Sequence, residues 1–269
     1  MAVISRITTQ KKNKHRYNIF LKNGQSEDYG FSVDEDILIQ FHLRKGLELD
    51  KETTEQLLKK DSIHKTYSLT INFLSYRMRS TKEIREYLIK KEVEQEQIEV
   101  VIKRLLSEGL LNDKEFAEAL VRTRVQTTSK GPMLVKKELI DKGILMTVAD
   151  EALSFYTYED QFEKATKWLE KKIRSSGKKS FRQQVQSIQQ TLMQKGFTQD
   201  IIKDVLANIE DEKDDSEEWD AIVYQGEKLV RKYEKKFEGS ELKQKVKATL
   251  YRKGFNFELM DRFIDEYLQ

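Results

Sequence analysis

Apolar and polar residues alternate with a period of two in the first 33 residues, which predicts β-strands. We expect three strands, at residues 3–8, 17–21 and 29–33. Asn23-Gly24 tolerates positive φ and predicts a hairpin turn between the second and third strands. From Asp34 the apolar residues move to helical spacing, so a helix is expected to cover one face of the sheet. We predict a small α+β domain with a three-stranded antiparallel sheet over residues 1–60.

From about residue 66 the apolar positions recur every three to four residues, which predicts a succession of amphipathic helices. Ser80 followed by Glu83 is a capping-box pattern, and Asn112 with Glu115 repeats it. Pro132, the only proline, suits the first turn of a helix, because the N–H that proline lacks has no helical partner there. Further helix N-caps are expected at Thr147, Thr198, Ser240 and Asn256.

A six-residue pattern, leucine-x-x-lysine-glycine-apolar, occurs three times and predicts internal repeats. Its copies begin at Leu139, Leu192 and Leu250, and a weaker copy at Leu88 has Glu92 in place of the glycine. Positions 92, 143, 196 and 254 are 51, 53 and 58 residues apart, which is room for three helices each. Because glycine suits the left-handed position that ends a helix, we expect the weaker copy to end its helix differently. The alternative is a common helix stop without shared ancestry.

These signals predict a mainly α chain, an elongated tandem array of three-helix repeats resembling winged-helix or helix-turn-helix units behind the N-terminal domain. Seven carboxylates and one lysine between Glu210 and Glu218 repel one another, which indicates a solvated, flexible connection with a boundary near residue 214. The expected domains are residues 1–60, 66–110, 112–157, 159–210 and 216–269.

Composition excludes several function classes. The 269 residues include no cysteine, so disulfides, thiolate metal sites and cysteine nucleophiles are ruled out. One proline and 11 glycines disfavour an all-β chain, and 35% charged residues favour helices with charged faces. No stretch approaches twenty consecutive apolar residues, and the first residues lack the apolar region of a secretory signal. We expect a cytoplasmic protein without membrane contact.

Catalysis has little support in the sequence. None of His15, His42 and His64 belongs to a metal-binding His-Glu-x-x-His spacing, and each is expected to be a surface or packing residue. The chain has neither a Gly-x-x-x-x-Gly-Lys-Ser/Thr phosphate loop nor a Gly-x-Gly-x-x-Gly turn. We therefore expect no enzyme activity, no cofactor and no metal.

Basic residues gather where the first and second helices of each repeat meet. The chain has 49 basic and 46 acidic residues, a net charge of +3. If the repeats stack with similar rotation, these joints form a basic stripe suited to a phosphate backbone. The candidate contacts are Arg77, Arg79, Lys82, Arg122, Arg124, Lys130, Lys136, Lys137, Lys171, Lys172, Arg174, Lys178, Lys179 and Arg182. The alternative is that they only complement helix dipoles.

Most aromatic residues stand at helical core positions. Phe116, Phe155 and Trp168 are expected to be buried, and base stacking on them is disfavoured. Tyr76, directly before Arg77, is the aromatic residue most exposed in this interpretation.

Residues 66–155 contain an ordered pattern of three motifs. They are Arg77-x-Arg79-Ser80-x-x-x-Ile84-x-x-x-Leu88, then Leu105-x-x-x-Gly109-x-Leu111-x-Asp113-x-x-Phe116-Ala117, then Gly131-x-x-x-Val135-x-x-x-Leu139-x-x-x-Gly143-Ile144. This combination resembles the RecX family of RecA regulators. The N-terminal region and the two later repeats look like the long form of that family.

The resemblance implies a cytoplasmic, non-catalytic protein that binds the RecA filament and modulates it, usually by inhibition of recombinase, ATPase and co-protease activity in DNA repair and the SOS response. Its implied partners are the RecA filament and, weakly, single-stranded or duplex DNA. We expect a monomer. Two alternatives stay open: a sequence-specific helix-turn-helix protein, which would show strong site preference on naked duplex, and a helical-repeat scaffold, whose main association would be indifferent to salt.

Overall fold

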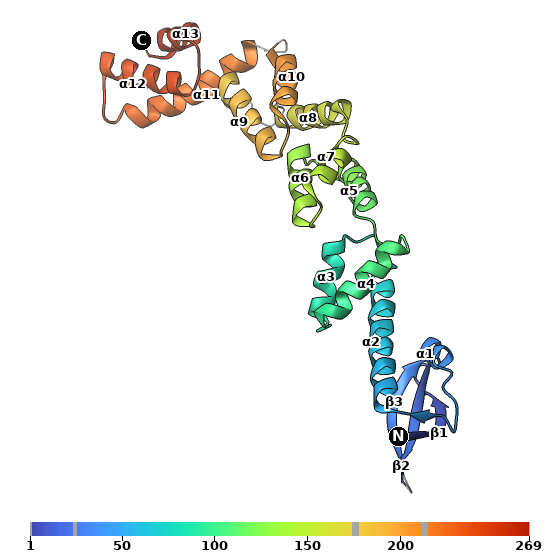
Figure 1. The fold of residues 1–269 in the computed structure, drawn as a ribbon. Helices are drawn as coiled ribbons and strands as arrows, with labels where there is room; N and C mark the ends of the chain where they lie inside the picture. The colour runs from blue at the N-terminus through green and yellow to red at the C-terminus, as the bar shows by residue number, and fades with distance from the viewer. Residues whose placement is uncertain (1, 24–25, 174–177, 211–214, 269) are drawn as a thin grey trace. The chain divides into compact units, whose positions relative to one another are not determined.

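The computed structural model describes residues 2–23, 26–173, 178–210 and 215–268, and it divides into two compact units, 1–116 (unit 1) and 117–269 (unit 2). Figure 1 shows a small sheet followed by helices throughout. The helices outside the sheet domain are α2 Lys51–Leu74, α3 Thr81–Lys90, α4 Gln95–Ser107, α5 Asp113–Thr127, α6 Pro132–Asp141, α7 Met146–Leu153, α8 Tyr158–Ile173, α9 Phe181–Gln194, α10 Gln199–Glu210, α11 Asp215–Tyr233, α12 Gly239–Arg252 and α13 Phe257–Tyr267. The predicted mainly α fold of tandem three-helix repeats is confirmed.

The N-terminal sheet has four strands in the order β3-β2-β1-β4, with antiparallel pairing throughout. They are β1 Ala2–Thr9, β2 Arg16–Asn23, β3 Ser26–Asp34 and β4 Glu48–Leu49. The predicted three strands are present, but the fourth was missed because two residues are too short to show an alternating pattern. Gly24 of the predicted hairpin turn lies outside the described residues.

One face of this sheet is covered by helix α1, Glu35–Gln40, as the sequence predicts. Asp34 caps the helix by accepting a hydrogen bond from the Asp36 N–H. Ile19 and Val33 of the sheet are fully buried, and Ile37 of α1 and Leu57 of α2 pack in the same core. The N-terminal domain therefore needs helix α2 to complete its core.

Helix α2 belongs to both parts of unit 1. It runs for 24 residues, so residues 61–65, which the sequence analysis left between two domains, lie inside one continuous helix. Leu57 in its first half packs on the sheet, while Tyr67 and Ile71 in its second half pack against the core of repeat 1. The sheet domain and the first repeat are thus joined by a shared helix.

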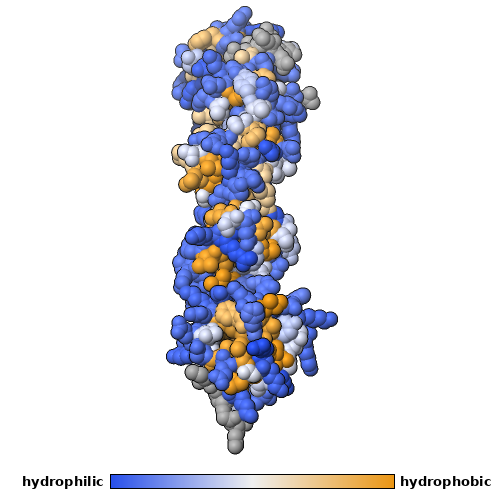
Figure 2. All heavy atoms as spheres, turned by 45° about the vertical axis from the view of Figure 1, so that its right-hand side comes forward, coloured by the Kyte–Doolittle hydropathy of each residue, from blue (hydrophilic) through white to orange (hydrophobic). Residues whose placement is uncertain are grey.

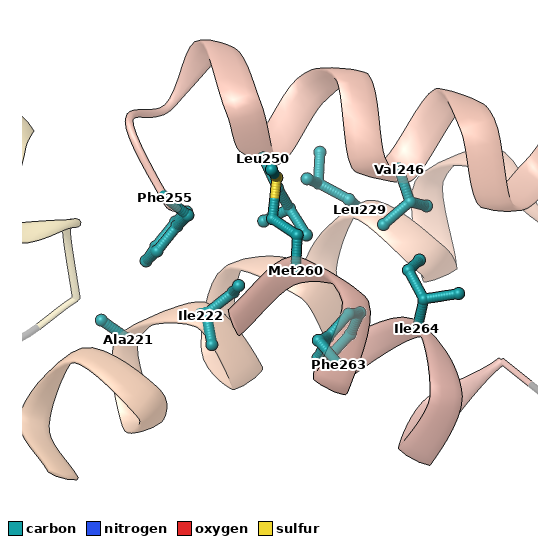
Figure 3. Packing of buried hydrophobic residues seen from close by; sticks show 9 residues of the cluster. All are labelled: Ala221, Ile222, Leu229, Val246, Leu250, Phe255, Met260, Phe263 and Ile264. Atoms are coloured by element: carbon teal, nitrogen blue, oxygen red, sulfur yellow. The ribbon is translucent and has the colours of Figure 1, made fainter. Parts of the chain in front are cut away.

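Repeats 1, 3 and 4 each have their own apolar core. In repeat 1 the core comprises Ile84, Leu88, Ile98, Val101, Ile102, Leu105 and Leu111. In repeat 4, Leu250 of α12 and Met260 of α13 point toward each other over Ile222 of α11 (Figure 3). Burial of such side chains contributes about 1.5–3 kcal/mol each, which is what holds three short helices together.

The repeated six-residue pattern ends the second helix of all four repeats in the same way. Gly143, Gly196 and Gly254 have φ of 81°, 83° and 84°, and Glu92 has φ of 59°. In each copy the next N–H bonds the carbonyl of the first leucine, as Val93 N to Leu88 O at 3.1 Å and Ile144 N to Leu139 O at 3.0 Å. The expectation that the first copy ends differently is wrong: Glu92 adopts the left-handed conformation although it is not glycine, and Val93 after it packs against the core of repeat 1.

Glu92→Gly is expected to stabilise unit 1 by about 1 kcal/mol, since a left-handed residue with a Cβ costs about 1–2 kcal/mol and glycine recovers most of it. Glu92 is exposed, so no packing is lost. Urea unfolding of the full chain measures the change. Lys91→Gly, at a residue with φ of −90°, is the control and should destabilise the same helix end. An unchanged midpoint for Glu92→Gly would contradict this account.

Most of the predicted helix starts are confirmed. Ser80 and Glu83 form the capping box, and Asn112 accepts from the N–H groups of Lys114 and Glu115 at 3.0 and 3.3 Å. Asn256 also caps its helix. Thr147 and Ser240 are not N-caps: these helices begin earlier, with Leu145 and Glu238 at the N-cap position and no side-chain cap bond.

The acidic block at residues 210–218 is only partly a connection. Residues 211–214 lie outside the described residues, but helix α11 begins at Asp215, and Glu218 on its first turn is buried. The predicted solvated connection through Glu218 is therefore wrong.

Within the described ranges, no helix combines the length and apolar character needed to span a bilayer. Hydrophilic side chains cover much of the face shown in Figure 2.

Candidate functional site

The loop between α2 and α3, residues 75–80, holds the first candidate cations. Arg77 donates to Glu83 Oε1 at 2.9 Å and to the Met78 carbonyl at 2.9 Å, and Glu83 also accepts from the Ser80 N–H at 3.2 Å. Arg77 is thus tied to the capping box. Lys82 lies 3.8 Å from Glu86 in an exposed pair, which contributes little.

Arg79 in the same loop is held differently. Its guanidinium lies 4.0 Å from the centre of the Phe73 ring, and Phe73 in turn stacks on Tyr87 at 3.9 Å. Its Nε is buried and has no hydrogen-bond partner among the described residues. Burial, and then the charge of Arg77, lower the pKa of Arg79 below its usual value. Tyr76 is 84% exposed, which confirms the prediction for that residue.

In repeat 2 the candidate cations are largely occupied within the protein. Arg124 bonds Glu138 through Nε and Nη2 at 3.0 and 2.5 Å, and Lys130 Nζ bonds the same carboxylate at 2.8 Å. Lys136 pairs with Asp150 at 2.5 Å. The hydrogen bond from Arg124 is the main cause that lowers the pKa of Glu138 to about 2.

Glu138→Gln is expected to destabilise unit 2 by about 2 kcal/mol at pH 7, because it leaves two partly buried cations without a charge partner. The folded pKa lies below the usual 4.5, so this stabilisation is present above pH 4.5 and is lost as the pH falls toward 2. Urea unfolding at pH 7 and pH 3 should show the variant's deficit shrinking at the lower pH. Glu227→Gln, at the exposed pair with Arg231, is the control and should change little at either pH. A deficit that is the same at both values would exclude the carboxylate as its cause.

The other two repeat 2 candidates are exposed. The Arg122 guanidinium lies 4.4 Å from the centre of the Phe155 ring and 3.4 Å from Glu118. Phe155 is 40% exposed, so its predicted place in the core is wrong, and it serves instead as a platform for Arg122. Lys137 is exposed on α6.

The repeat 3 candidates follow the end of α8 and the start of α9. Lys171 and Lys172 occupy the last turn of α8, where cations complement the helix dipole. The Lys178 ammonium lies 4.7 Å from the centre of the Tyr224 ring of repeat 4. Lys179 and Arg182 are exposed, and Arg174 lies outside the described residues. The contacts bring Arg79 close to Arg77 and bring Arg124 and Lys130 onto the shared carboxylate of Glu138. A common stripe over all joints stays a prediction.

Comparison with known proteins accounts for nearly the whole chain. Sequence models of RecX match it as the regulatory protein RecX N-terminal domain over residues 2–50, the first three-helix domain over 67–105, the second over 112–153, and the third over 159–206 and again over 215–264. Regulatory protein RecX of Oceanobacillus iheyensis is 49% identical over 270 residues, covering 100% of this chain and 99% of that protein.

The chain belongs to the RecX family. RecX of Halalkalibacterium halodurans is 44% identical over 99% of the chain. A crystal structure of regulatory protein RecX matches with a TM-score of 0.66 at 37% identity, covering 76% of this chain and 100% of that one. That of RecX from Lactobacillus salivarius matches with a TM-score of 0.54 at 36% identity, covering 56% and 98%. These relatives are named regulatory proteins rather than enzymes.

The family match also bears on the internal repeats. One model, that of the third RecX three-helix domain, matches both 159–206 and 215–264. Repeats 3 and 4 therefore share more than a helix stop, which disfavours the alternative of unrelated segments for these two.

Sequence reasoning missed two cations that connect repeats within unit 2. Lys164 Nζ donates to the carbonyls of Arg124 and Thr128 at 3.2 and 2.9 Å, and burial lowers its pKa. Lys195 Nζ donates to Ser129 Oγ at 3.0 Å. Lys195 belongs to the repeated pattern, but its partner is 66 residues away, which no local signal could show.

Three side chains of the described residues lie close enough together to be considered as metal ligands. Asp34, Asp36 and His64 offer ligand atoms within 4.8 Å of one another. His64 Nε2 lies 3.3 Å from Asp34 and 3.8 Å from Asp36. Asp34 already caps α1, and its contact with the half-buried His64 ring accounts for the arrangement.

Proposed function

We propose that this RecX-family protein binds the RecA–DNA filament and inhibits the recombinase, ATPase and co-protease activities of RecA. The most direct support is sequence similarity, over the full length of the chain, to proteins named regulatory protein RecX. The protein acts sterically and electrostatically, as a cytoplasmic monomer, without catalysis or a cofactor. Its working parts are the domains expected from the sequence, residues 1–60, 66–110, 112–157, 159–210 and 216–269, of which the first two share helix α2.

In this proposal the contacts are made by cations at the joints that either have no carboxylate partner or, like Arg122, form only an exposed pair. Arg124, Lys130 and Lys136 are bound to carboxylates, so each would have to give up a hydrogen bond before it could meet a partner. Lys137, Lys171, Lys179 and Arg182 are exposed, and the described residues offer them no carboxylate partner. We assign the electrostatic contact to these and to the exposed Arg122.

The third helices of the repeats disfavour the helix-turn-helix alternative. A protein that inserts a recognition helix into the major groove needs a helix without excess negative charge, because the DNA phosphates would repel it. Helix α7 has two acids and no base, and α10 has one lysine against three acids. Helix α13 has one arginine against four acids, and α4 has two of each sign. Positive charge is therefore concentrated at the joints instead.

Combined charge reversal tests the proposal. The variant with Lys137→Glu, Lys179→Glu and Arg182→Glu should need at least about tenfold more protein to inhibit DNA-dependent ATP hydrolysis by RecA. The matched control reverses three exposed lysines in helix interiors, Lys103→Glu, Lys203→Glu and Lys228→Glu.

Equal inhibition by the two variants would remove the joints from the mechanism. Strong preference for one sequence of naked duplex would favour the helix-turn-helix alternative instead. Association with RecA that does not change with salt would favour the scaffold alternative.

A further inference from the structure

Arg79 is the one half-buried arginine of the described residues without a carboxylate partner. The other three are Arg16, Arg85 and Arg124, which pair with Asp61, Glu99 and Glu138. Arg79 instead rests on the Phe73 ring, and its Nε has no hydrogen-bond partner in the part of the chain that is described. A partly desolvated charge without a counter-charge is costly, so the site favours an anion from outside.

Glu83, the carboxylate whose charge acts on Arg79, is already bonded to other groups. Glu83 accepts two hydrogen bonds from Arg77 and one from the Ser80 N–H, which completes the capping box. Asp113, the other acid at this end of α3, accepts from the Thr81 N–H at 2.7 Å. Both acids are therefore held by the start of α3, and Arg77 adds a second positive charge next to Arg79.

An exposed aromatic ring lies in the same loop. Tyr76, at 84%, is the most exposed of the large hydrophobic side chains in the described residues. Tyr76 and Arg79 are three residues apart, which limits the separation of their Cα atoms to about 11 Å. Exposed aromatic rings beside cations are typical of proteins that bind single-stranded nucleic acid, where bases stack on rings and phosphates meet cations.

We propose that the α2–α3 loop is a subsite for single-stranded polynucleotide, with a phosphate on the Arg79 guanidinium and a base on the Tyr76 ring. The guanidinium lies 4.0 Å from the centre of the Phe73 ring, and its planar set of N–H groups matches the oxygens of a phosphate. An acidic peptide would satisfy Arg79 but would leave Tyr76 without a role, so we favour the polynucleotide. The inference rests on the proposed function, since it assigns the DNA of the RecA–DNA filament to one loop.

Binding of fluorescein-labelled oligo(dT) to the full chain, followed by anisotropy over a range of salt concentrations, tests the subsite. Arg79→Ala should raise Kd about tenfold and lower the slope of log K against log salt by about 0.7, as expected for one lost phosphate contact. Tyr76→Ala should raise Kd about tenfold without changing that slope, while Tyr76→Phe, which keeps the ring, should bind like the parent. Arg44→Ala is the matched control, because Arg44 is an exposed arginine of unit 1 for which the described residues give no ion pair.

The binding constants of these variants distinguish the subsite from its alternatives. Equal losses for Arg79→Ala and Arg44→Ala would mean non-specific attraction and would overturn the subsite. A loss at Arg79 with none at Tyr76→Ala, together with displacement by polyglutamate, would assign the loop to an acidic peptide. Because Tyr76 is exposed, its variants test binding without affecting folding. RecA ATP hydrolysis is measured in parallel: if the parent protein fails to inhibit RecA while the oligo(dT) results hold, the proposed function fails and the subsite stands.

Discussion

Replacing Asp61 with alanine is expected to lower the free energy of unfolding of unit 1 by about 3–5 kcal/mol. The Asp61 side chain is buried in the middle of α2, where its two oxygens accept from Arg16 at 2.9 and 3.3 Å. One oxygen also accepts from the Asp34 N–H at 2.8 Å, and Lys65 lies 3.1 Å away. The variant would leave the Arg16 side chain, only 11% exposed, without its counter-charge. Urea unfolding of the full chain should show unit 1 lose its stability while unit 2 keeps its own.

Two further variants separate the charge from its surroundings. Lys65→Ala removes only the exposed partner of the network and should cost less than about 1 kcal/mol. The double variant Arg16→Met/Asp61→Leu replaces the pair by apolar side chains and should recover most of the loss. If Asp61→Ala changes stability by less than Lys65→Ala does, the pair does not hold α2 on the sheet.

The pH dependence of this pair follows from its pKa. Burial opposes ionisation of Asp61, but the hydrogen bonds from Arg16 and the Asp34 N–H outweigh it, so the pKa lies below the usual 3.8. The stabilisation is therefore complete above that value and is lost as the pH falls through the folded pKa. Acid should thus weaken the attachment of α2 to the sheet.

Helix α2 shows why a domain boundary could not be predicted here from sequence. Its first half packs Leu57 on the sheet and its second half buries Thr66 and Thr70 in repeat 1. The two halves bury different surfaces and use polar residues, so no single apolar stripe runs along the helix. A periodicity argument divides such a helix at the point where the stripe changes.

The features that sequence predicted well depend on residues close together in the chain. The Ser80 capping box, Pro132 at the start of α6 and the glycine helix stops depend on residues within one helical turn of each other, and all are confirmed. The state of each candidate cation depends on partners farther away: Arg124 meets Glu138 fourteen residues on, and Arg79 meets the Phe73 ring on the preceding helix. Sequence therefore located the joints but could not tell which charges are free to bind a partner.

Gly131→Ala is expected to destabilise unit 2 by about 2–4 kcal/mol, because repeat 3 approaches repeat 2 backbone to backbone at this residue. The Gly131 N–H donates to the Lys195 carbonyl at 2.7 Å and the Met133 N–H to the Gly196 carbonyl at 3.0 Å. A Cβ on Gly131 would lie 2.4 Å from the Gly196 carbonyl carbon and 2.5 Å from the Phe197 nitrogen. Backbone atoms cannot turn aside as a side chain can, so α6 would have to withdraw and lose both hydrogen bonds.

The backbone conformation of Gly131 shows that the expected loss of stability comes from packing and not from backbone strain. Its φ is −77°, which alanine adopts freely, so any loss comes from the contact with Lys195 and Gly196. Gly239→Ala is the complementary control: its φ is +57° with nothing within 4 Å of a Cβ, so it should cost only about 1 kcal/mol of backbone strain. Repeats 3 and 4 meet instead through Ser180 Oγ, which donates to the Lys253 carbonyl. Ser180→Ala should lower the free energy of unfolding by less than Gly131→Ala does, because it removes only this side-chain hydrogen bond. If Gly131→Ala unfolds like Gly239→Ala, the two repeats are not coupled through this contact. If it unfolds early and also weakens the inhibition of RecA that we propose, fixed spacing of the repeats is part of the proposed mechanism.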